Sequence, residues 1–435
     1  MNDTPERTDG PPAPGWRTHA CLVLLLIVYV FNFIDRQILS ILAQPIKAEL
    51  GLSDAQLGWL GGFAFAFVYT LLGLPAAILA QRVGRVKVIA AALMLWSAAT
   101  AACGLASSWV MLALGRFGVG VGEAGGVAPA QSLISDLYPA QHRARALAVF
   151  SLGVPLGSGF GIIFGGLLAS AFDWRHAFAV IGLAGLCFAP VFWFGLKGRD
   201  TQRTQAPPVW LALRRVTGNA SVWLISLGAS LSSVIGYGLM FWLPSVFMRS
   251  FKATLGSASL SFGLIVLIGG AMGILGGGVL ADRLGAKSPR WFALIPAAAY
   301  LLCIPAYGLV LSAPGFAFDT AAGFGLLVVA QALGLVWMGP VTASLHHVVD
   351  PEDRALASAV FLFVTNLIGL GFGSWIMGLL SDHLAHAYAA NALKMAVGYG
   401  LGFYVLGAAC FVAVSFILPR DWKAGQAIQA AHAPE

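Results

Sequence analysis

The stretch ASLSFGLIVLIGGAMGILGGGVLA, residues 258–281, decides the fold class. It contains no Asp, Glu, Lys or Arg, and its length suits a helix that crosses a hydrocarbon core of roughly 30 Å. Residues 55–80 and 220–247 are likewise free of these charged residues. Over the whole chain 59% of the residues are hydrophobic and 10% are charged, whereas soluble domains have about 25% charged residues. These patterns predict a polytopic membrane protein.

Apolar runs between charged or turn-rich breaks predict an all-α fold with twelve transmembrane helices. The spans are expected near residues 19–42, 55–80, 88–106, 109–134, 146–171, 176–196, 220–247, 258–281, 291–312, 319–345, 355–381 and 395–418. The longest break, residues 197–219, divides them six and six. We therefore expect an N-terminal six-helix bundle at 18–196, a cytoplasmic linker at 197–219 and a C-terminal six-helix bundle at 220–418. Residues 1–17 and 419–435 are expected to be cytoplasmic tails, the first one disordered.

The distribution of Lys and Arg predicts the orientation. An even number of spans places both chain ends on one side, and the segments on that side hold 18 of the 25 basic residues. Cytoplasmic loops carry the excess of Lys and Arg, so both termini are expected in the cytoplasm. The basic residues lie scattered in short loops and not on one solvated face, which argues against a nucleic-acid partner. Within the linker, residues 207–216 have a composition that suits a short helix at the membrane interface.

The two halves repeat each other. Residues 80–85 (AQRVGR) follow the second span, and residues 281–286 (ADRLGA) follow the eighth, 201 positions later. Residues 139–150 (PAQHRARALAVF) and 351–361 (PEDRALASAVF) form a second match, with Arg143 and Arg354 at equivalent places. Two parallel six-helix repeats are typical of transporters that bind substrate near the midplane, between the halves.

These loops resemble the signature of the Major Facilitator Superfamily, approximately G-x-L-a-D-R-x-G-R-K. Residues 278–287 (GVLADRLGAK) match it, whereas the first copy has Gln81 where the acid is usual. Residues 115–124 (GRFGVGVGEA) resemble the R-x-x-x-G-x-G pattern of the fourth span. The resemblance covers residues 18–420. It implies a cytoplasmic latch, which is a set of salt bridges formed by these loops. Its members here would be Arg82, Arg143, Asp282, Arg283 and Arg354, whose alternative role is that of positive-inside charges.

A narrower resemblance is to the spinster family of lysophospholipid and sphingosine-1-phosphate transporters, which has bacterial members. It rests on residues 31–37 (FNFIDRQ), 50–58 (LGLSDAQLG) and 122–124 (GEA). The resemblance implies the fold. One fold hosts many cargoes, however, so it does not fix the substrate.

Four charged residues lie well inside the predicted spans: Asp35, Arg36, Arg116 and Glu123. Charges at the bilayer centre cost at least about 2.5–3.5 kcal/mol and usually mark function. Arg116 and Glu123 share one helix face, whereas Asp35 and Arg36 point about 100° apart and should have different partners. We expect Asp35 and Glu123 to exchange a proton, while Arg36 and Arg116 balance it or bind an anionic headgroup. The alternative is a structural charge network that holds the first and fourth spans together.

The second half has no interior charge, and its polar and aromatic residues suggest a cavity wall for a lipophilic tail. The candidates are Ser233, Tyr237, Trp242, Gln331, Trp337 and Asn366, each of which could equally be an ordinary packing residue. A charged half that faces an apolar, aromatic half suggests an amphiphilic substrate.

Other patterns favour neither an enzyme nor a metal site. Residues 120–125 satisfy G-x-G-x-x-G but lie mid-span without a preceding strand, so a dinucleotide site is not expected. The histidines at 346, 347, 383 and 386 sit at span ends without convergent cysteines or acids, and no metal or cofactor is expected. Walker A, H-E-x-x-H and nucleophile-elbow motifs are absent from the sequence.

The sequence therefore predicts a monomeric, proton-coupled secondary transporter of an amphiphilic lipid such as a lysophospholipid, in a bacterial inner membrane. A symporter of a small organic anion and a multidrug efflux pump are the alternatives within the fold. A membrane-embedded acyltransferase would need a nucleophile and a base at one interface, and no such arrangement is evident in the sequence.

Overall fold

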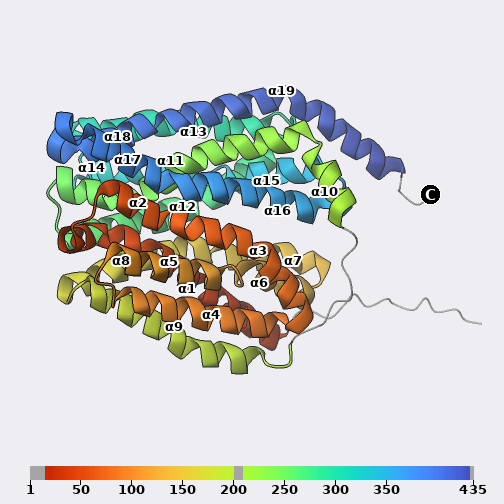
Figure 1. Cartoon of the computed structure of the whole chain (residues 1–435). Helices are drawn as coiled ribbons and strands as arrows, with labels where there is room; N and C mark the ends of the chain where they lie inside the picture. Colours follow the sequence, from red (N-terminus) through yellow and green to blue (C-terminus); the bar gives the residue numbers. More distant parts are fainter. Residues whose placement is uncertain (1–14, 200–208, 432–435) are drawn as a thin grey trace, which may run out of the picture.

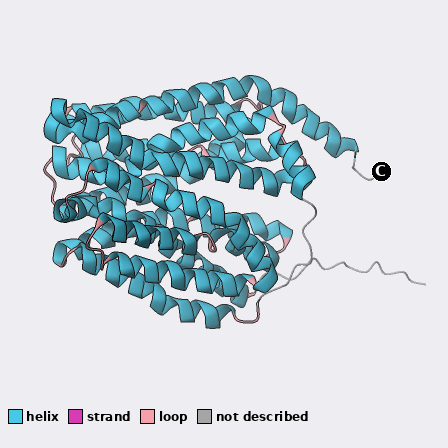
Figure 2. Ribbon diagram, in the orientation of Figure 1, coloured by secondary structure: helices cyan, strands magenta, loops and turns pink. Residues whose placement is uncertain are grey.

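The computed structural model describes residues 15–199 and 209–431. Every regular element in these residues is a helix, and the helices run side by side along one common direction (Figures 1 and 2). The predicted tail at 1–17 lies almost wholly outside the described residues, as does the first part of the linker. The all-α prediction is confirmed.

The twelve predicted spans are present. Eleven stretches of the described residues are long and apolar enough to cross a membrane, and the last of them, residues 356–422, is 67 residues long. At 1.5 Å per residue such a stretch would reach about 100 Å, far more than one crossing. A short 3₁₀ turn, η4 (Ala389–Asn391), divides it into two antiparallel helices.

The N-terminal bundle contains the first six spans. Three of them are broken near the middle of the bundle, at Gly62, at 124–126 and at Leu152, so two helix labels describe one span. The helices are α1 (Trp16–Leu50), α2 (Asp54–Gly61) with α3 (Phe63–Val83), α4 (Arg85–Cys103), α5 (Trp109–Glu123) with α6 (Val127–Leu137), α7 (Ala140–Ser151) with α8 (Gly153–Ala171), and α9 (Trp174–Leu196).

The C-terminal bundle repeats this plan. Its helices are α11 (Ala220–Ser250), α12 (Leu255–Gly285), α13 (Trp291–Ser312), α14 (Ala321–Leu335) with α15 (Met338–His347), α16 (Arg354–Thr365) with α17 (Gly371–Tyr388), and α18 (Ala392–Gly400) with α19 (Gly402–Ala431). Short 3₁₀ turns lie at η1 (Pro314–Phe316) and η2 (Pro351–Asp353), and a π-helical turn, η3 (Asn366–Leu370), joins α16 to α17.

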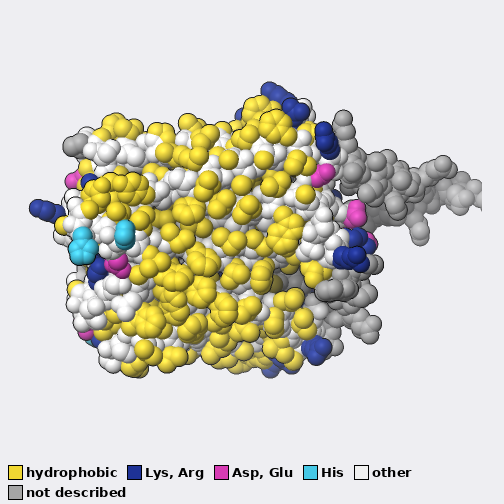
Figure 3. Space-filling model, turned by 45° about the horizontal axis from the view of Figure 1, so that its top comes forward, with side chains coloured by type: hydrophobic (Ala, Val, Ile, Leu, Met, Phe, Trp, Pro, Cys, Tyr) yellow, Lys and Arg dark blue, Asp and Glu magenta, His cyan; other side chains and the backbone are white. Residues whose placement is uncertain are grey.

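The outer surface explains how helices that are apolar all round remain stable. Large hydrophobic side chains such as Leu74, Leu114, Phe194 and Phe416 are more than 60% exposed. On the face shown in Figure 3, hydrophobic side chains form a broad band, and Lys, Arg, Asp and Glu gather at the two ends of the molecule. A bilayer covers such a band, and each helix satisfies its backbone polar groups internally, as a spanning segment must.

The linker helix is fastened to the C-terminal bundle. The predicted interfacial helix is observed as α10 (Val209–Thr217). Arg215 donates hydrogen bonds to both carboxylate oxygens of Asp353 at 2.8 and 2.9 Å and one to Glu352 at 2.9 Å. Asn219 donates to the carbonyl of Val348. Because these bonds reach only C-terminal residues, α10 belongs mechanically to that bundle.

The two bundles are joined toward one end of the molecule. We call the end that carries α10 and the C-terminus the linker end, and the other the distal end (Figure 1). The pairs α8 with α12 and α2 with α17 form the main seams. At the seams a Cβ on Gly58 would lie 2.3 Å from the Ser374 carbonyl oxygen. By contrast α6 and α7 pack extensively only on N-terminal helices, and α15 and α16 only on C-terminal elements and α10. The described bundles thus meet at the distal end and mid-level and have little contact at the linker end.

Candidate functional site

The four intramembrane charges lie together in the N-terminal bundle, on α1 and α5. Asp35, Arg116 and Glu123 are at most 1% exposed, and the Arg36 side chain is 10% exposed. Small residues permit this packing, since a Cβ on Gly122 would lie 2.6 Å from the backbone nitrogen of Trp96 in α4. The structure therefore brings these four residues together.

Arg36 and Glu123 form the central ion pair. The Arg36 Nε donates a hydrogen bond of 2.7 Å to the Glu123 Oε2. The other Glu123 oxygen, Oε1, is buried and has no hydrogen-bond partner among the described residues. Asn32 and Arg116 also face this carboxylate. Glu123 is thus held by an arginine on another helix and retains a free position for a proton.

Asp35 and Arg36 have different partners, as the sequence predicted. Arg116 donates a 3.1 Å hydrogen bond from Nη1 to the backbone carbonyl of Asp35 and not to its carboxylate. The Asp35 carboxylate faces Trp96 and Thr100 of α4 as well as Arg116 and Glu123. Its Oδ1 makes no hydrogen bond within the described part of the chain. A proton can therefore neutralise Asp35 without breaking a bond to an arginine.

The Arg36 guanidinium is enclosed by aromatic rings. Its Cζ lies 5.0 Å from the ring centre of Phe33, 4.9 Å from that of Phe65 and 4.7 Å from that of Tyr69. Each ring face attracts a cation. The rings also exclude water, which strengthens the charge interactions inside them. This arrangement stabilises the Arg36 charge while leaving part of its side chain accessible.

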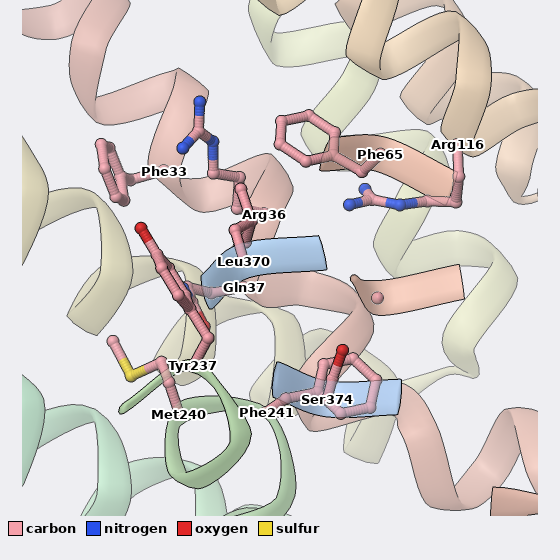
Figure 4. Close-up of a pocket in the computed structure, with 11 residues that line it drawn as sticks. Phe33, Arg36, Gln37, Phe65, Arg116, Tyr237, Met240, Phe241, Leu370 and Ser374 are labelled. Carbon is pink, nitrogen blue, oxygen red and sulfur yellow. The ribbon is translucent and has the colours of Figure 1, made fainter. Parts of the chain in front are cut away.

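Arg36 reaches a small pocket where the two bundles meet. The pocket has a volume of about 30 Å³, which is room for about one water molecule. Figure 4 shows Arg36 and Arg116 on one side of it, and Tyr237, Met240 and Phe241 of α11 on the other. The complete lining is Phe33, Arg36, Gln37, Gly61, Phe65, Arg116, Tyr237, Met240, Phe241, Leu370 and Ser374. The charges and the pocket thus form one site at the bundle interface.

Tyr237 is the one residue of the second-half set predicted from the sequence that lines this pocket. Trp242 is fully buried in the C-terminal bundle, where its Nε1 donates to the Ser374 carbonyl at 2.7 Å. Ser233 packs on Gly369. Gln331 lies beside Gly269, where α14 packs on α12 within the C-terminal bundle. Trp337 packs on Phe361, and Asn366 begins the π-helical turn η3. None of these five residues lines the pocket.

The predicted latch residues lie at the linker end but are not assembled. Arg82, Arg143, Asp282 and Arg283 are exposed and make no ion pair with another described residue. Arg354 donates from Nε to the His346 carbonyl at 3.0 Å, within its own bundle.

Sequence reasoning missed the ion pair that is formed nearby. Arg85 and Asp136 approach to 2.7 Å with their side chains 4% and 14% exposed. Arg85 ends the loop motif at residues 80–85, and Asp136 lies at the end of the fourth span. These two positions could have indicated the pair.

A second missed cluster joins the bundles at the distal end. Asp54, 2% exposed, accepts hydrogen bonds from Arg249 at 2.6 Å, from Lys47 and from Ser381. The Asp382 carboxylate in turn accepts the backbone N–H groups of Asp54 and Ala55 at the start of α2, where the helix dipole favours a negative charge. We call these residues the distal clamp. It connects α1 and α2 to α11 and α17.

Comparison with known proteins assigns the class that this fold and site define. Residues 25–374 match the family model of the Major Facilitator Superfamily, so the chain belongs to that superfamily and is a transporter, not an enzyme. More particularly, its homologues are spinster proteins. It is 27% identical to "Protein spinster homolog 1" of Homo sapiens over 95% of this chain and 83% of that protein. It is 33% identical to an "MFS-type efflux pump" of Mycolicibacterium smegmatis, over 93% of this chain and 94% of that one.

A solved structure agrees with this assignment. The crystal structure of a bacterial homologue of the human lysosomal transporter spinster, described as inward-facing and unoccupied, matches with a TM-score of 0.83. It is 27% identical, and the match covers 94% of this chain and 99% of that one. The superfamily and spinster resemblances of the sequence are thereby confirmed.

Proposed function

We propose that this protein is a proton-coupled transporter that moves an amphiphilic lipid, such as a lysophospholipid, by alternating access. It acts as a monomer in a bacterial inner membrane, with the linker end in the cytoplasm. The observation that carries the proposal is the placement of Arg36, which is paired with Glu123 on one side and reaches the pocket between the bundles on the other. One arginine thus links a protonatable group to the expected substrate position.

The coupling follows from competition for Arg36. While Glu123 is ionised, its carboxylate holds the guanidinium through a charge-assisted hydrogen bond. A proton on Glu123 removes that negative charge, and Arg36 is then available to an anionic headgroup in the pocket. Asp35 supplies a second acid in the same network. Release of the proton restores the Arg36–Glu123 pair and expels the headgroup.

The asymmetry of the pocket favours an amphiphile. Its N-terminal wall carries two arginines, whereas its C-terminal wall is formed by Tyr237, Met240, Phe241, Leu370 and Ser374. The homologues support this reading, since one of them, from Arabidopsis thaliana, is named a probable sphingolipid transporter and is 26% identical over 85% of this chain.

Two alternatives have an observation in their favour. The pocket, with its volume of about 30 Å³, has room for about one water molecule, so it would have to widen less for a small organic anion than for a lipid. The relative of 33% identity is named an efflux pump, which favours export of drug-like compounds. Both alternatives use the same charge network and differ in the cargo.

The deciding experiment is uptake into proteoliposomes under an imposed pH gradient, with a lysophospholipid compared against a small aromatic acid. We expect gradient-driven lipid movement in the wild type, and its loss in Glu123→Gln and Asp35→Asn with substrate binding retained. Asp319→Asn is the matched control, because Asp319 is an exposed carboxylate in the loop between α13 and α14. Full pH-driven transport in both site variants would refute proton coupling. Acid transport without lipid transport would assign the organic-anion alternative.

A further inference from the structure

The C-terminal bundle carries a groove that the transport site does not use. It lies between α13 on one side and α18 with α19 on the other, and has a volume of about 620 Å³, which is within the usual range for a ligand site. None of these three helices packs extensively on the N-terminal bundle. The groove therefore opens away from the bundle interface, on the outer face of the molecule.

Glycines line the groove at positions where side chains would otherwise fill it. Toward the middle of the bundle α13 and α19 are held together by Tyr300 and Tyr404, whose rings stack with centres 5.2 Å apart. Nearer the distal end, a Cβ on Gly308, Gly398 or Gly402 would meet no atom within 4 Å. The missing side chains leave an open channel along the two helices.

The lining is apolar along its length and basic at one end. Ile304, Leu311, Leu401 and Val405 supply aliphatic walls, and Lys394 in the first turn of α18 lies at the distal limit. The Ser312 hydroxyl already donates a hydrogen bond to the Gly308 carbonyl, so it does not make the lining more polar. Lys394 has no ion-pair partner within residues 15–199 and 209–431. An ammonium group thus stands unpaired beside an apolar channel.

We infer that this groove binds one anionic phospholipid of the surrounding bilayer, with an acyl chain along α13 and the headgroup phosphate on Lys394. The lining residues belong to membrane-spanning stretches, so lipid is the medium that borders the groove. A lysine near a membrane surface extends its ammonium toward the headgroups, where it attracts an anionic lipid. The inference does not depend on which cargo the protein transports.

Native mass spectrometry of the full-length protein in detergent, titrated with phosphatidylglycerol or phosphatidylcholine, tests the proposal. We expect the wild type to retain one phosphatidylglycerol more tightly than phosphatidylcholine. Lys394→Gln should weaken phosphatidylglycerol retention about fivefold. Lys252→Gln should leave it unchanged, because Lys252 is exposed at the same end and lies outside the groove.

Filling the groove gives an independent test. Gly398→Leu should abolish retention of either lipid at this site, whereas Gly325→Leu, on an exposed glycine of α14 that also has no neighbour within 4 Å, should not. Wild-type retention in both Lys394→Gln and Gly398→Leu would overturn the proposal. Dissociation of a dimer by Gly398→Leu would also overturn it, by assigning the groove to a second copy of the chain. If Gly398→Leu fails to fold, the result with Lys394→Gln alone decides.

Discussion

Arg36 is the residue on which both the stability and the function of the site depend. It bonds to Glu123, is surrounded by three aromatic rings and reaches the pocket between the bundles. Replacing one member of a buried ion pair leaves the other charged and unpaired, which costs more than the pair itself contributes. Arg36 should therefore be more sensitive to substitution than the exposed arginines of the linker end.

We expect Arg36→Gln to destabilise the protein by about 3 kcal/mol or more, since Glu123 would remain buried without its partner. The double variant Arg36→Gln with Glu123→Gln should recover most of that loss, because both charges are then removed. Thermal unfolding in detergent measures both effects. Arg283→Gln is the control, since Arg283 is exposed. Equal destabilisation in the single and double variants would show that the pair does not determine stability.

The sequence identified the charged residues of the site but could not pair them. Asp35, Arg36, Arg116 and Glu123 are conspicuous because charge is rare inside spans. Helix geometry further predicted that Asp35 and Arg36 point apart. That Arg36 meets Glu123, 87 residues away, depends on how α1 packs against α5. Trp96 and Thr100, which face Asp35, were missed because uncharged polar residues are not distinctive in an apolar span.

At the scale of elements, the spans were predictable and their interruptions were not. Apolar length alone indicated the second span at 55–80, yet the chain breaks at Gly62 between α2 and α3. The reason is tertiary, since a Cβ there would lie 2.6 Å from both the Gly371 carbonyl and the Ser374 hydroxyl. Contact with α17 from the other bundle shapes α2, and a single-span reading of the sequence cannot anticipate it.

The seam between α2 and α17 makes a prediction at this scale. A leucine at Gly58 cannot fit against the Ser374 backbone, so Gly58→Leu should separate the bundles at the distal end. Cysteines introduced at the linker end should then be labelled more slowly as that side closes. Gly73→Leu in α3 is the control, because a Cβ at Gly73 meets no atom within 4 Å. Unchanged labelling in Gly58→Leu would argue against this seam as a determinant of the conformation.

At the scale of the whole molecule, the hydrogen bonds that join the two bundles are unequally distributed between the distal end and the linker end. The hydrogen bonds that join the bundles come from Ser40, Gln44, Ser374 and the distal clamp. The predicted latch at the linker end is unformed among the described residues, and one solved structure to which the chain is similar is described as inward-facing. The sequence did not reveal the clamp, because Asp54 and Arg249 lie 195 residues apart and at span ends, where charges are ordinary.

Asp54→Asn should shift the conformational equilibrium of the transporter toward the state in which the distal end is open. The variant weakens the two charge-assisted bonds that Arg249 donates to Asp54 across the bundles, each contributing about 1.5–3 kcal/mol, so the distal-open population should rise by at least about tenfold. Distances between spin labels placed across the distal end measure this shift. Asp319→Asn, in an exposed loop, should cause none. A distance distribution identical to the wild type would exclude the clamp as the element that holds this face closed.

The burial of the distal clamp also determines how the molecule responds to salt. Mobile ions weaken attraction between exposed charges beyond roughly 8 Å at physiological ionic strength, but they screen buried pairs much less. Asp54 is only 2% exposed and the Arg249 side chain 18%, so added sodium chloride has little access to the ion pair between them. The distal end should therefore stay closed across a wide range of salinity, although an ion pair helps to hold it.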